Sequence, residues 1–316
     1  MLKYKNFSLI KPEEEQRKRI SHLINEYNGS IFHEVELNKI VQDNFGSELF
    51  YLVDNPKNIN SFTPIHITKN KLGVKRYNCN PLGDIPYAGF VGKEQVDVKQ
   101  FEVGFFESVK YVGFPYIKDT IHKSNNNLGS GETNMVDLSL EEDEIFSKMS
   151  SSKRRNIRKA IKAEIEVKHF FTEEGLEQFW PILEQLHKSL GYHEFTLDYY
   201  KNFIQNYGSQ KQAFVLIAYK EKVPVSGLFI LGNKNYMHFY KGASLFDVKK
   251  VGQGELLHWE AIKLSKSLGA KYYDLCNLNK EKLPEIYRFK TGISQNIIEY
   301  TKYTKNSIGY KVANRI

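Results

Sequence analysis

Three apolar segments lie close together in the second half of the chain, and they constrain the fold more than any other feature of the sequence. They run Ala213–Tyr219, Val225–Leu231 and Tyr236–Gly242, with the polar turns Glu221–Lys222 and Gly232–Asn235 between them. Short runs rich in Val, Ile, Phe and Tyr are typical of buried strands. Because turns this short join antiparallel neighbours, the pattern predicts a three-stranded antiparallel meander.

A loop that contains two glycines follows the meander and leads into a helix predicted over Glu255–Leu268. Gly252 and Gly254 let the backbone come close to a ligand, and the unpaired amides at a helix start attract phosphate. We therefore predict a pyrophosphate site, and its residues are Lys249, Lys250, Val251, Gly252, Gln253 and Gly254. Glu255 opposes this prediction because its carboxylate would repel a phosphate. The alternative is a plain turn between a strand and a helix, since short glycine motifs are weak signals on their own.

The rest of the chain alternates between helical and strand-like segments. Helices are predicted over residues 12–28, 34–45, 96–109, 151–163, 173–190, 197–207 and 284–289, and another from Leu140 after the capping box Ser139–Glu142. Strands are predicted over residues 49–53, 62–68, 74–79, 111–118, 166–170, 271–275 and 297–303. The polar segment His122–Asn134 indicates a long surface loop, or alternatively a mobile lid over a site. This pattern predicts an α/β chain of the α+β type.

The composition is that of a globular protein with two domains. The chain has 316 residues, 41% of them hydrophobic, and its 45 basic and 37 acidic side chains give a net charge of +8. This charge favours an anionic partner such as a nucleotide, CoA, tRNA or the inner leaflet of a membrane. The sequence shows no secretory signal and no apolar run of membrane-spanning length, and Cys79 and Cys276 are too far apart in sequence to indicate a disulfide framework. We expect a cytoplasmic protein that makes at most peripheral contact with a membrane.

The segment Lys153–Lys162 carries six basic side chains. On a helix, Ile157 would lie in a buried stripe while the basic side chains cover the outer faces. Arginine binds phosphate in a bidentate manner, so Arg154, Arg155 and Arg158 are predicted to bind a diphosphate substrate or an RNA backbone. The alternative is a solvated basic helix that binds no ligand.

Four segments of the second half resemble the FemAB family and related GNAT-like acetyltransferases. They are KRRNIRKA (Lys153–Ala160), FYKGAS (Phe239–Ser244), GELLHWEAIKLSKSLGAKYYDL (Gly254–Leu275) and YRFKTGI (Tyr287–Ile293). FemAB proteins transfer amino acids from aminoacyl-tRNA to peptidoglycan precursors, and the lysine of a Phe-Lys pair near their C-terminus sits at the transfer site. The pair Phe289-Lys290 stands at that place in this sequence. The loop at residues 249–254 also resembles the CoA-binding loop of GNAT proteins, although Lys249 stands where that pattern has Arg or Gln.

The resemblance implies two GNAT-like halves, each a mixed, mostly antiparallel sheet flanked by helices. Residues 1–138 would form an N-terminal half that binds the acceptor, and residues 139–316 a C-terminal catalytic half. It also implies that Arg288 and Phe289, beside the lysine of the pair, contact the substrate.

Four side chains are candidates for the chemistry of acyl transfer. Lys290 would stabilise the oxyanion that develops on the reacting carbonyl, and Tyr287 would protonate the leaving thiolate of a CoA donor. Tyr240 would orient the acceptor amine, and Asp274 would hold that amine or accept its proton. Each has a structural alternative: core packing for the two tyrosines, a surface charge for Lys290 and a loop cap for Asp274.

No other catalytic constellation stands out in the sequence. His238 and His258 lie near the same region and are predicted to be structural, and the nine histidines show no metal-ligand spacing. The sequence has neither a serine nucleophile elbow nor a Cys–His signature. Direct attack of a bound amine on the acyl carbonyl is therefore the simplest chemistry.

The sequence predicts an acyltransferase that N-acylates an amino group of a cell-envelope precursor, either an amino sugar on a nucleotide or lipid carrier or a peptidoglycan peptide. Its co-substrate would be acetyl-CoA or another acyl-CoA, with no tightly bound cofactor. One alternative is FemAB-type transfer of an amino acid from aminoacyl-tRNA, and a second is a non-catalytic module that binds tRNA or a membrane surface. The glycine loop favours CoA, whereas the basic helix and Phe289-Lys290 favour tRNA.

Overall fold

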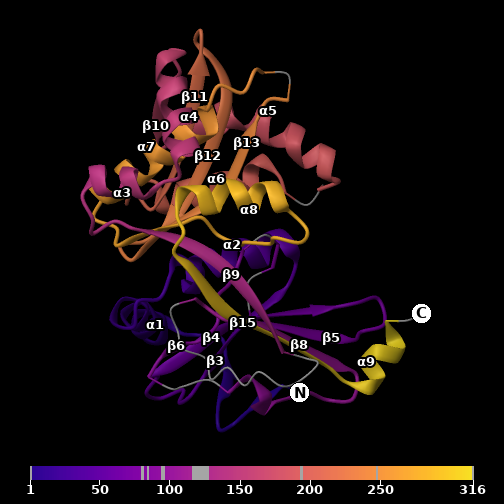
Figure 1. The fold of residues 1–316 in the computed structure, drawn as a ribbon. Helices are drawn as coiled ribbons and strands as arrows, with labels where there is room; N and C mark the ends of the chain where they lie inside the picture. The colour runs from indigo at the N-terminus through magenta and orange to yellow at the C-terminus, as the bar shows by residue number, and fades with distance from the viewer. Residues whose placement is uncertain are drawn as a thin grey trace. The chain divides into compact units, whose positions relative to one another are not determined.

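The computed structural model describes residues 2–79, 82–83, 85–93, 97–115, 128–192, 195–246 and 248–314 (Figure 1). The chain forms two compact units, unit 1 from Met1–Glu132 with Ile298–Ile316 and unit 2 from Thr133–Ile297. This division differs from the predicted halves, because the end of the chain belongs to unit 1. The last strand, β15 (Ile297–Asn306), pairs antiparallel with β8 (Glu107–Val112), and its Tyr303 is buried in the core of unit 1.

Unit 2 contains the predicted meander. β11 (Ala213–Lys220), β12 (Val223–Gly232) and β13 (Tyr236–Ser244) pair antiparallel in sequence order. β10 (Glu166–Phe170) pairs with β11, while β14 (Tyr272–Asp274) lies parallel to β13 and antiparallel to β9 (Leu128–Asp137).

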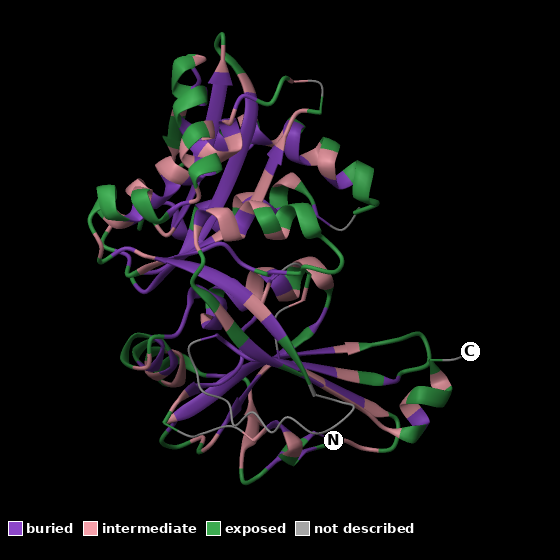
Figure 2. Cartoon of the chain, in the orientation of Figure 1, coloured by how far each residue is buried: buried purple, intermediate pink, exposed green. Residues whose placement is uncertain are grey.

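Helices cover both faces of this sheet. α4 (Ser151–Lys162) and α7 (Gln253–Ser267) pack on the face that carries Phe214 and Leu228, whereas α5 (Glu173–Leu190) and α6 (Leu197–Tyr207) pack on the face that carries Phe229. Successive side chains of a strand point to opposite faces, so the central strands are buried on both sides (Figure 2). The helices α3 (Glu142–Lys148) and α8 (Pro284–Ile293) complete the described part of unit 2.

Unit 1 contains a sheet with the strand order β15-β8-β5-β4-β3-β2, in which β5 and β8 run parallel and the other described neighbours run antiparallel. Its strands are β2 (Ser8–Ile10), β3 (Glu48–Val53), β4 (Ser61–Lys69), β5 (Lys75–Cys79) and β6 (Val91–Gly92), which pairs with β4, and a separate ribbon joins β1 (Lys3–Tyr4) to β7 (Phe101–Glu102). Its helices are α1 (Glu14–Glu26), η1 (Ile31–His33), α2 (Val35–Phe45), η2 (Val98–Gln100) and α9 (Ile308–Ala313). The prediction of mixed, mostly antiparallel sheets flanked by helices is confirmed.

Four local predictions were wrong or lie partly outside the described residues. The strand predicted over residues 111–118 corresponds to β8, which runs Glu107–Val112, and residues 116–118 lie outside the described residues. The helix predicted over residues 96–109 is instead η2, β7 and the start of β8, because β8 finds partners on both sides in β5 and β15. Ser139 does not cap a helix: its side chain bonds Asp137, and α3 begins at Glu142. Of the predicted loop at residues 122–134, the part from Leu128 onward belongs to β9, and residues 122–127 lie outside the described residues.

Cys79 and Cys276 are buried thiols that are not joined in a disulfide. None of the helices in the described ranges has the length and hydropathy needed to cross a membrane.

Candidate active site

A cavity of about 720 Å³ opens in unit 2 beside the start of α7. Its wall includes Gly252, Gln253 and Gly254 of the glycine loop, together with Phe289 and Lys290 of α8. The two features that the sequence analysis linked to acyl transfer therefore line one cavity. Apolar side chains from α5, β12, β13, the segment after β13 and the start of α8 form much of the remaining wall, and these are Leu186, Leu228, Phe239, Leu245, Phe246, Leu283 and Ile286.

Lys290 lies in this wall with only 7% of its surface exposed. Its Nζ donates hydrogen bonds to the carbonyl oxygens of Cys276 at 2.5 Å and Asn277 at 3.1 Å. Both of these residues have left-handed backbone conformations, with φ of 54° and 32°, which is costly for residues other than glycine. Burial lowers the pKa of Lys290, while the neighbouring Cys276 and Asp274 act to raise it.

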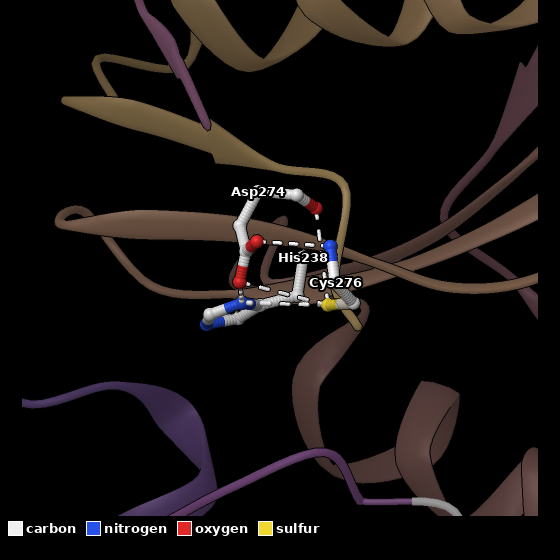
Figure 3. Close-up of side chains that lie close together, drawn as sticks. All are labelled: His238, Asp274 and Cys276. Atoms are coloured by element: carbon white, nitrogen blue, oxygen red, sulfur yellow. Dashed lines mark hydrogen bonds and ion pairs between the residues drawn. The ribbon is translucent and has the colours of Figure 1, made fainter. Parts of the chain in front are cut away.

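Asp274 is fully buried and does not belong to the cavity wall. Figure 3 shows its carboxylate close to His238 and Cys276. One carboxylate oxygen accepts from the backbone N–H of Cys276 at 2.9 Å and from the Thr133 hydroxyl at 2.6 Å, and the other lies 2.8 Å from His238 Nδ1. Asp274 thus fixes the turn whose carbonyls hold Lys290. Burial raises the pKa of this carboxyl to about 7, although the hydrogen bonds from Cys276 act to lower it. The prediction that Asp274 touches the acceptor amine has no support in this geometry.

Among the described residues, His238, Asp274 and Cys276 are the one group whose potential metal-ligand atoms lie within 4.8 Å of one another. These atoms face each other directly: the carboxylate is bonded to the imidazole, and the Cys276 thiol lies 3.6 Å from the same carboxylate. We interpret the group as a hydrogen-bonded support for the turn and not as a metal centre.

The glycine loop is held mainly by protein contacts. Gly252 has φ of 100°, and a Cβ on it would lie 2.2 Å from the backbone oxygen of Asn156 on α4. The Gln253 side chain accepts from the backbone N–H of Val251 at 2.8 Å. Gly254 is open, since a Cβ there would meet only Phe289 at 3.8 Å. Lys250 lines the cavity, whereas Lys249 and Val251 do not.

Glu255, at the first turn of α7, forms a buried ion pair with Lys153. The Lys153 Nζ lies 2.9 Å from Glu255 Oε1 and 3.6 Å from the centre of the Phe289 ring, and Asn156 donates to the same oxygen at 2.9 Å. The hydrogen bond from Asn156 and the charge of Lys153 lower the pKa of Glu255 despite its burial. The basic helix therefore contributes to the site through Lys153 and Asn156, which sequence analysis did not select.

The three predicted phosphate-binding arginines of α4 are not in the cavity wall. The Arg154 guanidinium donates to the backbone oxygens of Ser147 and Met149 at the end of α3. Arg158 lies over the ring of Phe146, and Arg155 is exposed. The side chain of α4 that reaches the cavity with a positive charge is Lys159.

Tyr240 lies outside the cavity wall, on the α6 face of the sheet. Its hydroxyl is 3.1 Å from that of Tyr199, and its ring packs against Phe203 and Phe229. A bulge between β12 and β13 falls at this position and turns the neighbouring Phe239 toward the cavity. The structure therefore gives Tyr240 a packing role in place of the predicted contact with the amine.

Two predicted residues of α8 also lie outside the cavity wall. Tyr287 is half-buried, and Arg288 is exposed and 3.6 Å from Glu285. On this helix Arg288 points away from the face that carries Phe289 and Lys290, whereas Tyr287, three residues before Lys290, lies at the edge of that face.

His258, which we had predicted to be structural, does line the cavity. It lies on α7 four residues after Gly254, a spacing that places two residues on the same face of a helix. That spacing was the available signal in the sequence, and it becomes informative once the face of α7 that meets the cavity is known.

Comparisons with known proteins agree with this fold. Residues 105–221 match the model of the FemAB family, and no curated protein matches the chain. The crystal structure of FemX has a TM-score of 0.67 with 11% identity and covers 96% of this chain and 99% of that one. A tandem GNAT protein from the clavulanic acid biosynthesis pathway has a TM-score of 0.52 with 8% identity over 95% of this chain and 98% of its own.

A further similar structure is L-PGS from Bacillus licheniformis, with a TM-score of 0.51 and 14% identity over 93% of this chain and 92% of its own. These likenesses confirm the prediction of tandem GNAT-like halves. The FemAB family match over residues 105–221, and the fold shared with FemX and with a tandem GNAT protein, agree with the resemblance of the second half of the chain to this family.

Proposed function

We propose that this protein transfers an aminoacyl group from aminoacyl-tRNA to an amino group of a peptidoglycan precursor. One observation carries the proposal: Lys290 of the Phe-Lys pair lies in the wall of the cavity, with its ammonium oriented by two backbone carbonyls. A fixed positive charge at the reacting carbonyl would stabilise the developing oxyanion. The FemAB match and the FemX-like fold support the same class of reaction.

The chemistry requires no covalent enzyme intermediate. The nitrogen of the acceptor amine forms a bond to the acyl carbon, and the bond from that carbon to the leaving oxygen of the tRNA breaks with its electron pair. The proton lost by the amine passes to that oxygen. The apolar wall would exclude water that competes with the amine for the ester.

The geometry around Gly252 favours tRNA over CoA as the donor. The space that its missing Cβ leaves is filled by α4, so this glycine serves a close approach between helices and not an approach to a ligand. Glu255 also places a carboxylate at the helix start where a pyrophosphate would bind, and Lys153 already compensates its charge. Exposed basic groups on α4, Arg155 among them, are available for an RNA backbone.

An acyl-CoA donor is the second candidate, and one observation favours it. The first amides of α7 and the side chain of Lys250 belong to the same cavity wall as Lys290, an arrangement that suits an anionic group. Under either proposal unit 2 contains the catalytic site, and binding of the acceptor by residues 1–138 stays a prediction.

A donor assay separates the candidates. The purified protein is incubated with nucleotide-linked peptidoglycan precursors and either tRNA charged with radiolabelled amino acids or radiolabelled acetyl-CoA. Transfer of label from charged tRNA, lost on ribonuclease treatment, is the expected result.

Label that arrives from acetyl-CoA would replace the proposal by the second candidate. Turnover with neither donor would favour a non-catalytic binding module. Thermal stabilisation provides an independent readout, because a ligand at a hundred times its Kd adds about 2.7 kcal/mol to the free energy of unfolding. Uncharged tRNA should stabilise the protein and CoA should not.

A further inference from the structure

The hydrogen bond between His258 and Tyr273 fixes which ring nitrogen of the histidine carries the proton. His258 Nδ1 lies 2.9 Å from the Tyr273 hydroxyl. Within the described part of the chain, neither side chain makes another hydrogen bond. Tyr273 is fully buried, and burial raises the pKa of its hydroxyl well above the usual value, so the hydroxyl keeps its proton.

That buried proton needs an acceptor, since an unsatisfied buried donor costs about 1–3 kcal/mol. His258 Nδ1 is the acceptor within reach. If Nδ1 instead carried a proton and donated it to the tyrosine oxygen, the hydroxyl proton would be left unsatisfied in the core. The neutral ring therefore carries its proton on Nε2.

The surroundings of the ring keep it neutral. Burial, together with the positive charges of Lys290 and Lys153, lowers the pKa of His258 to about 3. A ring in this state is a poor proton acceptor for an amine, but its remaining N–H is an intact donor.

His258 lines the same cavity as Lys290. His258 lines the cavity while Tyr273 does not, so the Nδ1 edge of the ring faces the core. The ring of Phe239 contacts both groups: its centre lies 4.6 Å from that of the His258 ring and 5.4 Å from Lys290 Nζ.

We propose that His258 is a catalytic residue whose Nε2–H donates a hydrogen bond to the acyl carbonyl oxygen beside Lys290, and that Tyr273 is the positioning residue that fixes this tautomer. The proposal rests on the acyl transfer proposed above. His258 keeps its proton throughout: the amine proton still leaves with the departing oxygen, and the two donors share the negative charge on the carbonyl oxygen.

Nitrogen-15 spectra of histidine-labelled protein test the tautomer without any substrate. The wild type should show His258 with a protonated Nε2 and a bare Nδ1. Tyr273→Phe removes the hydroxyl and should give a mixture of tautomers. Tyr200→Phe is the matched control, because it removes a second buried tyrosine hydroxyl, 3.5 Å from His187 and outside the cavity wall, and should leave the His258 signals unchanged.

Turnover of the substrate pair found in the donor assay tests the catalytic role. His258→Ala should lower kcat about 10²-fold with little change in KM, the usual result of removing one oxyanion donor. His258→Gln, whose amide N–H comes close to the place of Nε2–H, should recover part of the loss. Tyr273→Phe should lower kcat and Tyr200→Phe should not.

A wild-type spectrum with a protonated Nδ1, or a His258→Ala variant that folds and keeps its kcat, would overturn the proposal. If the wild type turns over neither donor, the proposed function is wrong. The tautomer of His258 is still tested in that case, because the nitrogen-15 spectrum requires no substrate.

Discussion

At the scale of single residues, Lys290 combines a structural and a chemical role. Two of its ammonium protons are bound by carbonyl oxygens, and the third remains for a substrate. Lys290→Met keeps the length of the side chain but removes the charge. We expect kcat to fall at least 10²–10³-fold, with a loss of about 1–3 kcal/mol in stability from the two carbonyls left without a donor.

Lys266→Met is the matched control for Lys290→Met. The Nζ of Lys266 also donates to two backbone oxygens, those of Leu138 and Leu140, but it lies outside the cavity wall. This variant should show a comparable change in urea denaturation with kcat intact. If both variants lose activity equally, Lys290 acts through folding and the oxyanion role is wrong.

The raised pKa of Asp274 predicts that the stability of the protein depends on pH. Burial raises the pKa of the Asp274 carboxyl from the ordinary 3.8 to about 7 in the folded protein, so the folded state binds more protons than the unfolded state between these values. The stability that this group contributes is complete below about pH 4 and is lost as the pH rises through 7.

Asp274→Asn removes that titration. The variant should therefore become more stable relative to wild type as the pH increases from 4 to 7, so that the difference in the free energy of unfolding measured by urea denaturation (variant minus wild type) increases. A difference that stays constant over this range would show that Asp274 is ionised in the folded protein at all these pH values.

At the scale of elements, the contact between α4 and the start of α7 decides how the site is built. Gly252→Ala would force a Cβ to within 2.2 Å of the Asn156 oxygen at a φ of 100°, so we expect a loss of at least about 1–3 kcal/mol. Gly254→Ala meets no close neighbour, and its stability should be unchanged or up to about 1 kcal/mol higher. Thermal unfolding of the two variants compares them directly.

The Gly254→Ala variant also tests which acyl donor the protein uses. Gly254 lines the cavity, so Gly254→Ala narrows it without unfolding the protein. If a pyrophosphate bound at this helix start, the variant would raise the KM for the donor strongly. A KM that is unchanged for aminoacyl-tRNA agrees with the proposed function.

At the scale of the whole molecule, the return of the chain to unit 1 predicts the effect of truncation. Removal of residues 298–316 deprives unit 1 of β15 and α9, and exposes an edge of β8 that β15 now covers. Hydrogen exchange should show lost protection in β8 and β5, with β11 and β12 of unit 2 still protected. Uniform loss of protection in both units would mean that they fold as one cooperative structure.

Local sequence patterns predict most of the elements of unit 2 and both motifs of the site. The meander, α4, α5, α6 and α7 follow from local periodicity, which depends only on the near neighbours of each residue. The glycines at the start of α7 and the Phe-Lys pair were recognisable because they are short, contiguous patterns.

Which side chains meet depends on the tertiary structure. It brings Lys153 to Glu255 across more than a hundred positions of sequence and pairs β15 with β8, and it turns Tyr240 away from the cavity and His258 toward it. Such contacts depend on which face of each helix or strand packs against a neighbouring element. A bulge of one residue moves the side chains that follow it to the opposite face of the strand. Local patterns carry no information on that choice, because it is made by packing between segments that are distant in the chain.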